Sequence, residues 1–389
     1  MILKWLTICI TGLTILFTAG SPSFSQDDQQ IAEQVYEELE YIASLFNSEE
    51  EIDPQRIAAL IEFVNTIPED TSLTLKKRNN MNGAFHAFQV DSSLRDLLDY
   101  AYNPEVPLYI TMPSSVQSQQ WTTPEIENEL HRLINAAEAA GDTIFLRGQE
   151  SETITPDTNT GGYYSYNQNR MVALLPGSSG PILLSATLQD QASEVGRKGC
   201  IIGDDGNWDY LFSDKAGLNK TGLGWVDSYM YEAYSVAIYI PDPAADTLKT
   251  GTFKWLNAGW KKINMVKAHH ILGGIKRFAA DLKGVLESPD LPEVEEIINK
   301  YLELLEKDEE ELRRLVSPHL ELISTTDNNG SCPESFISSV ASGEYLEQMS
   351  SEEIIRILLL NYLKTHIGDN SSKTAKADST AGQGNWQKS

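Results

Sequence analysis

The hydrophobic pattern is clearest between residues 171 and 240. Two apolar runs, residues 171–175 and 182–184, flank the sequence Pro-Gly-Ser-Ser-Gly-Pro, which is typical of a chain reversal. A second strand pair is expected at residues 200–202 and 208–212, joined by an Asp-Gly turn in which glycine supplies a positive φ. Residues 231–240 are apolar on both faces, and such a strand is usually covered on both sides. The pattern predicts a β-rich centre with helices packed over it.

Helical periodicity precedes this centre. Apolar residues recur at helical spacing in residues 31–46, 53–64, 94–101 and 122–137. Asp53 followed by Pro54 is a typical helix start, and Thr122 with Glu125 has the spacing of a capping box.

The same periodicity returns after the centre, in residues 253–263, 275–282, 294–315 and 350–362. Gly273 and Gly274 predict a break between the first two of these helices, and Asp290 predicts the cap of the next.

These elements predict an α+β fold in which a central antiparallel β-sheet is flanked by N-terminal and C-terminal helical parts. The expected divisions are a signal peptide at 1–25, a helical N-terminal part at 26–142, a β-rich central part at 143–248, a helical C-terminal part at 249–367 and a disordered tail at 368–389.

The first 25 residues resemble an export signal. Lys4 precedes an apolar run over residues 5–17, and small residues follow up to Ser25. A membrane anchor would need about 20 apolar residues, more than this run supplies. The sequence therefore predicts a periplasmic or extracellular protein cleaved near Ser25.

The net charge of the chain argues against one class of partner. The chain carries 30 Lys and Arg against 56 Asp and Glu, a net charge of −26. So acidic a surface argues against general nucleic-acid binding. Cys9 lies in the predicted signal, which leaves Cys200 and Cys332 either to form one disulfide in an oxidising compartment or to remain separate thiols.

Aromatic residues suggest a ligand site. Tyr163, Tyr164, Trp208 and Trp225 lie in or beside loops of the β-rich part, and exposed rings there would form a stacking surface for a sugar, a peptide or an apolar ligand. The alternative is that strands favour aromatic residues and the core needs them. The ligand itself is not identified by the sequence, and neither is a cofactor.

Acidic residues in the following turn suggest a metal. Asp204, Asp205 and Asp209 could supply oxygens to Ca²⁺, although their spacing is not that of an EF-hand and a plain hairpin turn explains them equally well.

A basic segment suggests a membrane surface. Residues 249–283 carry eight Lys and Arg against one Asp, and Trp255, Trp260, Lys261, Lys262 and Lys267 could attach the protein to anionic lipid. The preferred alternative is that the acidic residues of 293–311 lie beside this segment and compensate its charge.

No nucleophile elbow, phosphate-binding loop or zinc motif occurs in the sequence. The leading hypothesis is therefore an exported, non-enzymatic binding or interaction protein. One alternative is a secreted hydrolase that uses one of the acids at 204–209 with a His, and another is a membrane-surface protein that uses the basic segment.

Overall fold

The computed structural model describes residues 31–137, 141–189, 191–220, 224–326 and 332–368. The predicted signal peptide at 1–25 lies outside the described residues, as does the predicted tail after Gly368.

The described residues contain one large antiparallel sheet of nine strands. Its order is β1 (Ser72–Arg78), β2 (Met81–Val90), β13 (Thr247–Trp260), β12 (Ser228–Asp242), β7 (Ile182–Gln189), β6 (Ser165–Leu175), β4 (Ile144–Ile154) and β3 (Val116–Trp121), with β14 (Ile263–Asn264) paired to β13. Helices lie N-terminal and C-terminal to its central strands, so the predicted α+β class is confirmed.

One face of the sheet, the outer face, is covered by the first two helices, α1 (Glu33–Leu45) and α2 (Ala58–Thr66). Alternate strand residues such as Phe85, Tyr234 and Phe253 point to these helices and are fully buried. The Tyr234 hydroxyl donates to the Leu39 carbonyl oxygen at 2.6 Å, which satisfies the polar end of this buried ring. The outer face therefore forms an almost wholly apolar core.

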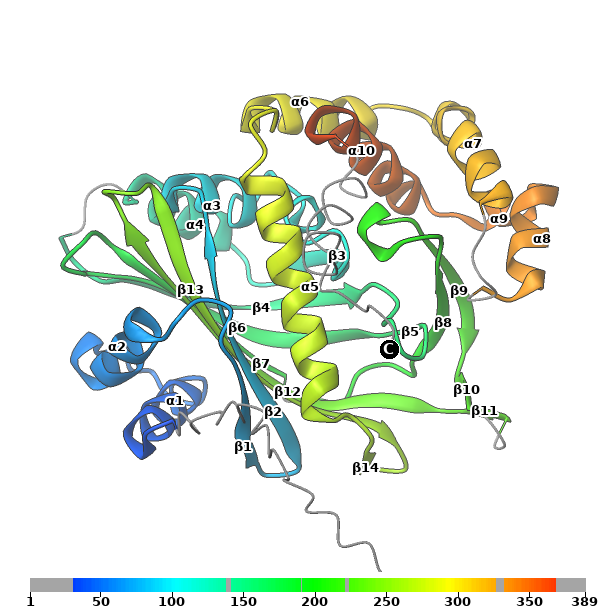
Figure 1. The fold of residues 1–389 in the computed structure, drawn as a ribbon. Coiled ribbons are helices and arrows are strands. Elements are labelled where there is room, and N and C mark those ends of the chain that lie inside the picture. The colour runs from blue at the N-terminus through cyan, green and yellow to red at the C-terminus, as the bar shows by residue number, and fades with distance from the viewer. Residues whose placement is uncertain (1–30, 138–140, 190, 221–223, 327–331, 369–389) are drawn as a thin grey trace, which may run out of the picture.

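The opposite, inner face is crossed by the long helix α5 (Ala268–Leu286), as Figure 1 shows. Two shorter helices, α3 (Leu94–Ala101) and α4 (Ile126–Asn135), contribute to the core at one end of the same face. Both faces of β12 are thus covered, as its sequence predicts.

A smaller layer stands beside the large sheet. It consists of a second sheet of β5 (Gly162–Tyr163), β8 (Arg197–Ile201) and β9 (Tyr210–Ala216), and of a hairpin of β10 (Leu218–Lys220) and β11 (Gly224–Val226). Five helices complete it: α6 (Val294–Leu305), α7 (Glu309–Thr325), α8 (Glu334–Ser342), α9 (Glu344–Gln348) and α10 (Ser351–Ile367).

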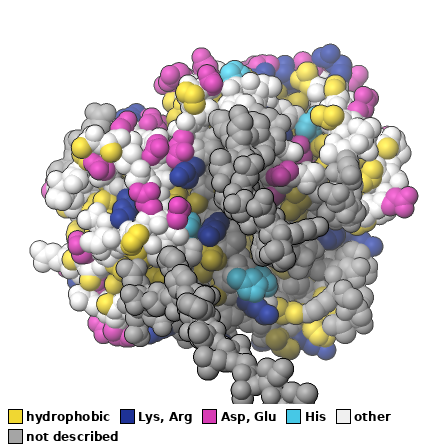
Figure 2. All heavy atoms as spheres, viewed as in Figure 1, with side chains coloured by type: hydrophobic (Ala, Val, Ile, Leu, Met, Phe, Trp, Pro, Cys, Tyr) yellow, Lys and Arg dark blue, Asp and Glu magenta, His cyan; other side chains and the backbone are white. Residues whose placement is uncertain are grey.

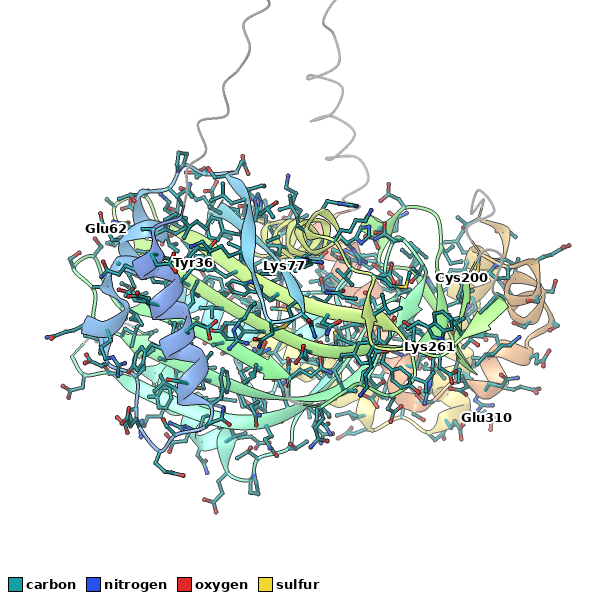
Figure 3. The ribbon with its side chains drawn as sticks, turned by 90° about the horizontal axis from the view of Figure 1, so that it is seen from below. Tyr36, Glu62, Lys77, Cys200, Lys261 and Glu310 are labelled. Carbon is teal, nitrogen blue, oxygen red and sulfur yellow. A yellow bond between two sulfur atoms is a disulfide. The ribbon has the colours of Figure 1, made fainter. Side chains whose placement is uncertain are left out.

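Cys200 of β8 and Cys332, which precedes α8, form a disulfide with a Cα–Cα distance of 5.3 Å. Figure 3 shows Cys200 at the opposite end of the molecule from Tyr36 of α1 and Glu62 of α2. The disulfide therefore ties the C-terminal helices to the small sheet, far from the outer-face core.

Both parts of the chain that were expected to be helical contain strands of the large sheet. The N-terminal part contains β1 and β2, whose Lys-rich and Asn-Gly-containing sequences lack a regular apolar alternation. Residues 253–260 belong to β13, although Phe253, Leu256 and Trp260 have helical spacing. Phe253 is fully buried against the outer-face helices, and strand pairing on both sides of β13 fixes its conformation.

Four local predictions differ from the structure. The helix α5 continues through Gly273 and Gly274 without a break. Glu125 has a left-handed backbone and forms no capping box with Thr122, while α6 begins after Glu293 rather than at an Asp290 cap. In the turn before β9 (η3, Asp205–Asn207), the positive φ angles fall on Gly203 and Trp208, not on Gly206.

Candidate functional site

The inner face of the sheet is apolar at one end of its strands and polar at the other end. At one end it carries apolar residues such as Phe88, Val172 and Leu183, which are buried under the helices. At the other end a row of paired residues runs across four strands, namely Lys254, Ser235, Thr187 and Arg170. Burial of polar side chains is costly unless they find partners, so this polar half marks a region with a role other than packing.

A cavity of about 460 Å³ lies between the polar half of the inner face and α5. We call it the α5 cavity. Its walls are largely apolar and come from the ends of β12 and β13, from the segment before α5 and from α5 itself: Met230, Leu256, Ala258, Trp260, Val266 and Ile271. Its volume and its few polar groups are those of a small-molecule site.

Lys254 of β13 lines this cavity from the side of the sheet. No carboxylate lies within ion-pairing distance of its Nζ, and no hydrogen-bond acceptor contacts it, among the described residues. Burial lowers the pKa of Lys254, and the negative charge of Glu152 opposes this shift only in part. A half-buried amine in an apolar cavity is a ready partner for a polar group of a ligand.

Glu152, the acid whose charge opposes the lowered pKa of Lys254, belongs to a buried cluster on β4 and β6. Glu150 is fully buried and accepts hydrogen bonds from Gln119 (2.6 Å), Gln168 (2.6 Å) and Arg170 (3.0 Å). Glu152 accepts one from the Tyr166 hydroxyl. Burial, followed by the charge of Glu150, raises the pKa of Glu152. Within this cluster Glu150 is paired with Arg170, whereas Glu152 has no ion pair among the described residues.

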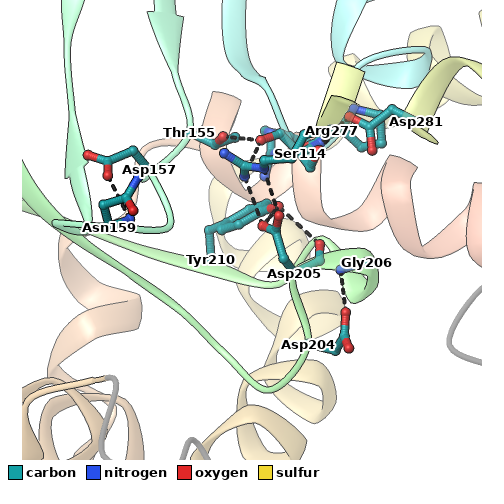
Figure 4. Close-up of polar contacts among 12 residues, drawn as sticks. Ser114, Thr155, Asp157, Asn159, Asp204, Asp205, Gly206, Tyr210, Arg277 and Asp281 are labelled. Carbon is teal, nitrogen blue, oxygen red and sulfur yellow. Dashed lines mark hydrogen bonds and ion pairs between the residues drawn. The ribbon is translucent and has the colours of Figure 1, made fainter. Parts of the chain in front are cut away.

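The α5 end of the cavity is held by an ion-pair network, drawn in Figure 4. Arg277 of α5 contacts both oxygens of Asp205, at 2.7 and 2.8 Å. Asp205 also accepts a hydrogen bond from the Tyr210 hydroxyl at 2.8 Å. Arg277 also donates to the Ser114 carbonyl oxygen at 2.5 Å, and Ser114 donates its amide and hydroxyl hydrogens to Asp281, one helical turn after Arg277, at 2.9 and 2.7 Å. These contacts fix α5 to the small sheet and to the segment before β3.

The four aromatic residues predicted to bind a ligand do not form one surface. Tyr163 and Trp208 are each 4% exposed and belong to the core. Tyr164 lines the α5 cavity, where its hydroxyl lies 2.9 Å from the Ser228 hydroxyl. Trp225 lies on β11, but its side chain is not among those that the structure describes. Of the three residues whose side chains are described, only Tyr164 therefore lines the α5 cavity.

The three acids predicted to bind a metal point to different partners. Asp204 accepts the Gly206 amide hydrogen (2.8 Å), Asp205 pairs with Arg277, and Asp209 contacts Lys364 (2.8 Å). Within the described residues, no group of three His, Cys, Asp or Glu side chains is arranged to hold a metal ion. Asp204 instead stabilises the turn itself, and Asp205 and Asp209 connect the turn to the surrounding helices.

An Asp–His pair of the kind required by the hydrolase hypothesis is present. His319 Nε2 lies 3.3 Å from Asp209 Oδ1. Burial raises the pKa of Asp209, but the hydrogen bond from His319 and the charge of Lys364 outweigh it and lower the pKa below its ordinary value. The adjoining cavity measures only about 10 Å³, room for about one water molecule and not for a substrate.

The predicted basic segment is divided between two elements. Trp255 is 2% exposed and packs in the outer-face core, while Trp260 lines the α5 cavity beneath Lys261. Lys261, Lys262 and Lys267 are exposed near the start of α5. None of the helices that the structure describes is both long and apolar enough to cross a membrane. The five residues therefore do not form a single exposed surface.

The predicted charge compensation is also not found in the contacts. No ion pair among the described residues joins 249–283 to 293–311, and the acids of α7 pair within their own part of the chain, as Lys307 does with Glu303 and Glu311. Figure 2 shows acidic side chains spread over the upper part of the face that carries α3, α4 and α6.

The sequence prediction did not single out Lys254, which lines the α5 cavity, or Glu152, whose charge acts on Lys254. Glu152 belongs to β4, in a stretch rich in polar residues for which the apolar pattern predicts no strand. Alternation of Glu150, Glu152 and Ile154 is the signal that could have placed them on one face of a strand.

No protein-family model matches the chain, and no curated protein matches it significantly.

Proposed function

We propose that this chain is an exported, non-enzymatic binding protein that holds a small amphipathic acid in the α5 cavity. The ligand has an apolar body, which packs against residues such as Leu256, Trp260 and Ile271, and a carboxylate that reaches Lys254. The observation that carries the proposal is a half-buried lysine without a partner among the described residues, placed in an otherwise mainly apolar cavity.

The cavity fits such a ligand in volume and in chemistry. About 460 Å³ lies within the range of pockets that bind small organic molecules. Apolar walls favour an apolar body in proportion to the area that it removes from water. A carboxylate would give the Lys254 ammonium the charge partner that the protein does not supply, and hydrogen bonds between charged groups contribute about 1.5–3 kcal/mol.

Export is the second part of the proposal. The apolar run after Lys4 supports it, and so does the disulfide between Cys200 and Cys332, because disulfides persist mainly in oxidising compartments. Sequencing the N-terminus of the protein recovered from the exported fraction tests it, and an intact Met1 on that protein would contradict cleavage near Ser25.

Calorimetric titration with decanoate and with decanol tests the ligand class. These probes share an apolar chain and differ in charge. The wild-type protein is expected to bind decanoate at one site, and Lys254→Met is expected to weaken this binding roughly ten- to hundredfold because it removes the charged partner. Decanol binding should be unaffected by the same substitution.

Lys249→Met is the matched control. Lys249 lies on the same strand, but on the other face of the sheet, where its Nζ donates to the Asn65 carbonyl oxygen at 2.6 Å. It should leave the affinity for decanoate unchanged. Equal loss of decanoate and decanol binding in Lys254→Met would show that the lysine acts only through packing, and failure of the wild-type protein to bind either probe would reject the site.

A further inference from the structure

A second cavity, of about 470 Å³, lies between β3–β6, the small sheet and helices α8–α10. We call it the α10 cavity. Tyr163 lines it, while the next residue, Tyr164, lines the α5 cavity, so the short strand β5 forms part of the wall between the two. It has more serines on its wall than the α5 cavity, namely Ser118, Ser165, Ser213, Ser335, Ser339 and Ser350.

Arg356 of α10 is a buried cation on the wall of this cavity. Its side chain belongs to a residue that is only 2% exposed, and one of its terminal nitrogens donates to the Pro113 carbonyl oxygen at 2.9 Å. Its Nε has no hydrogen-bond partner, and no carboxylate lies within 4 Å of it, among the described residues. A buried guanidinium is normally paired with an acid, because burying a charge alone is costly.

Aromatic rings surround Arg356 without neutralising it. The centroids of Tyr109 and Tyr210 lie 5.7 Å from its guanidinium carbon, and that of Phe212 lies 6.0 Å away. Such contacts offset part of the cost of burying a cation, but they leave its Nε–H without an acceptor.

Gln117 of β3 supplies the complementary group. Its Oε1 is buried, lines the same cavity and has no hydrogen-bond donor among the described residues. The cavity therefore presents one unused cationic donor and one unused neutral acceptor. A single ligand satisfies both when it carries a carboxylate, which accepts from Arg356, and a hydroxyl, which donates to Gln117.

The acid nearest in sequence to Arg356 is held away from it. The Tyr345 hydroxyl donates to Glu353 Oε1 at 2.7 Å and accepts the Phe212 amide hydrogen at 2.9 Å. Burial raises the pKa of Glu353, although the hydrogen bond from Tyr345 and the charge of Arg356 act in the opposite direction. The raised pKa favours the uncharged form of Glu353 and reduces its repulsion of an anion in the cavity. This network also fixes the position of α9 and α10 against β9.

We infer that the α10 cavity is a second binding site, specific for a small hydroxylated organic acid whose carboxylate pairs with Arg356 and whose hydroxyl groups bond to Gln117 and the serine-rich wall. This inference is independent of the ligand proposed for the α5 cavity.

Titration of the full-length protein with glucuronate and citrate, at constant ionic strength in chloride, tests it. Glucose lacks the carboxylate, and cyclohexanecarboxylate lacks the hydroxyl groups. At least one of the two hydroxy acids is expected to bind at one site, and glucose and cyclohexanecarboxylate at least tenfold more weakly. Arg356→Gln should reduce hydroxy-acid affinity at least tenfold, Arg356→Lys should restore part of it, and Lys254→Met should leave it unchanged.

A second variant guards against misfolding of the Arg356 variants. Ser335→Trp places bulk at an exposed position of the cavity wall and leaves the buried arginine intact, so it should block the hydroxy acids while the thermal unfolding midpoint stays near the wild-type value. The inference is overturned when neither hydroxy acid binds the wild-type protein, when glucose or cyclohexanecarboxylate binds as tightly as they do, or when Ser335→Trp binds them like wild type.

Discussion

Asp281 is the ionisable residue whose protonation should be visible in the stability of the whole protein. It is 5% exposed, and burial raises its pKa to about 7, although the hydrogen bonds from Ser114 and the charge of Arg277 act in the opposite direction. In the unfolded chain an Asp releases its proton near pH 3.9. Between these values the folded state binds more protons than the unfolded state, so the contribution of Asp281 to the free energy of unfolding falls as pH rises.

We therefore predict that Asp281→Asn gains stability relative to wild type as pH rises from about 4 to about 7. A shift of about three pKa units sets an upper bound of roughly 4 kcal/mol on this gain. Urea unfolding of both proteins across this range measures it, and subtraction of the two curves removes the other titrating groups. Asp290→Asn, at an exposed position four residues after Leu286, is the control. The difference between its free energy of unfolding and that of wild type should be the same at every pH.

A constant gap between Asp281→Asn and wild type at every pH would contradict the prediction. It would show that Asp281 stays ionised in the folded protein and that its two hydrogen bonds from Ser114 outweigh its burial.

At the scale of elements, α5 carries two adjacent glycines that differ in what they face. A Cβ added at Gly273 or at Gly274 would meet no atom within 4 Å, but only Gly274 lines the α5 cavity. Both positions lie in the helix interior, where glycine is about 0.5–1 kcal/mol less favourable than alanine. The glycine at 274 therefore leaves room in the cavity at the expense of helix stability.

This geometry predicts different effects for two matched substitutions. Gly273→Leu and Gly274→Leu should both stabilise the protein, by up to about 1 kcal/mol, because both replace a glycine inside a helix with open space around it. Only Gly274→Leu should weaken decanoate binding, since only its side chain extends into the cavity. Urea unfolding and calorimetric titration of the two variants measure these effects, and equal decanoate affinities would mean that the ligand does not reach α5.

The elements also show where sequence reasoning succeeds. Helices with one apolar stripe, such as α1 and α2, and strands bounded by strong turn residues, such as β6 and β7, were predictable because the pattern and the burial agree. The strand β13 was not predictable from periodicity, because its inner face carries Lys254 and threonines where an ordinary core strand carries apolar residues.

The candidate sites were also not predictable from the pattern of apolar residues. Lys254 and Arg356 acquire their significance from what surrounds them in space, and neither residue lies in a motif. Tyr164 could be proposed from its loop, but its neighbour Tyr163 points to the other cavity, a difference set by strand alternation that the sequence shows only once β5 is known.

At the scale of the molecule, the two cavities depend on different parts of the fold. The α5 cavity is built mainly on the large sheet and α5, whereas the α10 cavity needs the small sheet to stay in contact with α8–α10. The disulfide between Cys200 and Cys332 joins these last two parts across 132 residues of chain. Loss of the disulfide should therefore weaken ligand binding in the two cavities to different extents.

We predict that the double substitution Cys200→Ala with Cys332→Ala lowers the free energy of unfolding by roughly 2–5 kcal/mol, because the unfolded chain regains the freedom of a long loop. Hydroxy-acid binding in the α10 cavity should weaken more than decanoate binding in the α5 cavity, since α8 loses its covalent tie to β8. Urea unfolding and the two titrations, performed on the same preparation, compare these losses. Equal weakening at both sites would contradict the separation, because it would mean that the large sheet and the C-terminal helices respond as one cooperative unit.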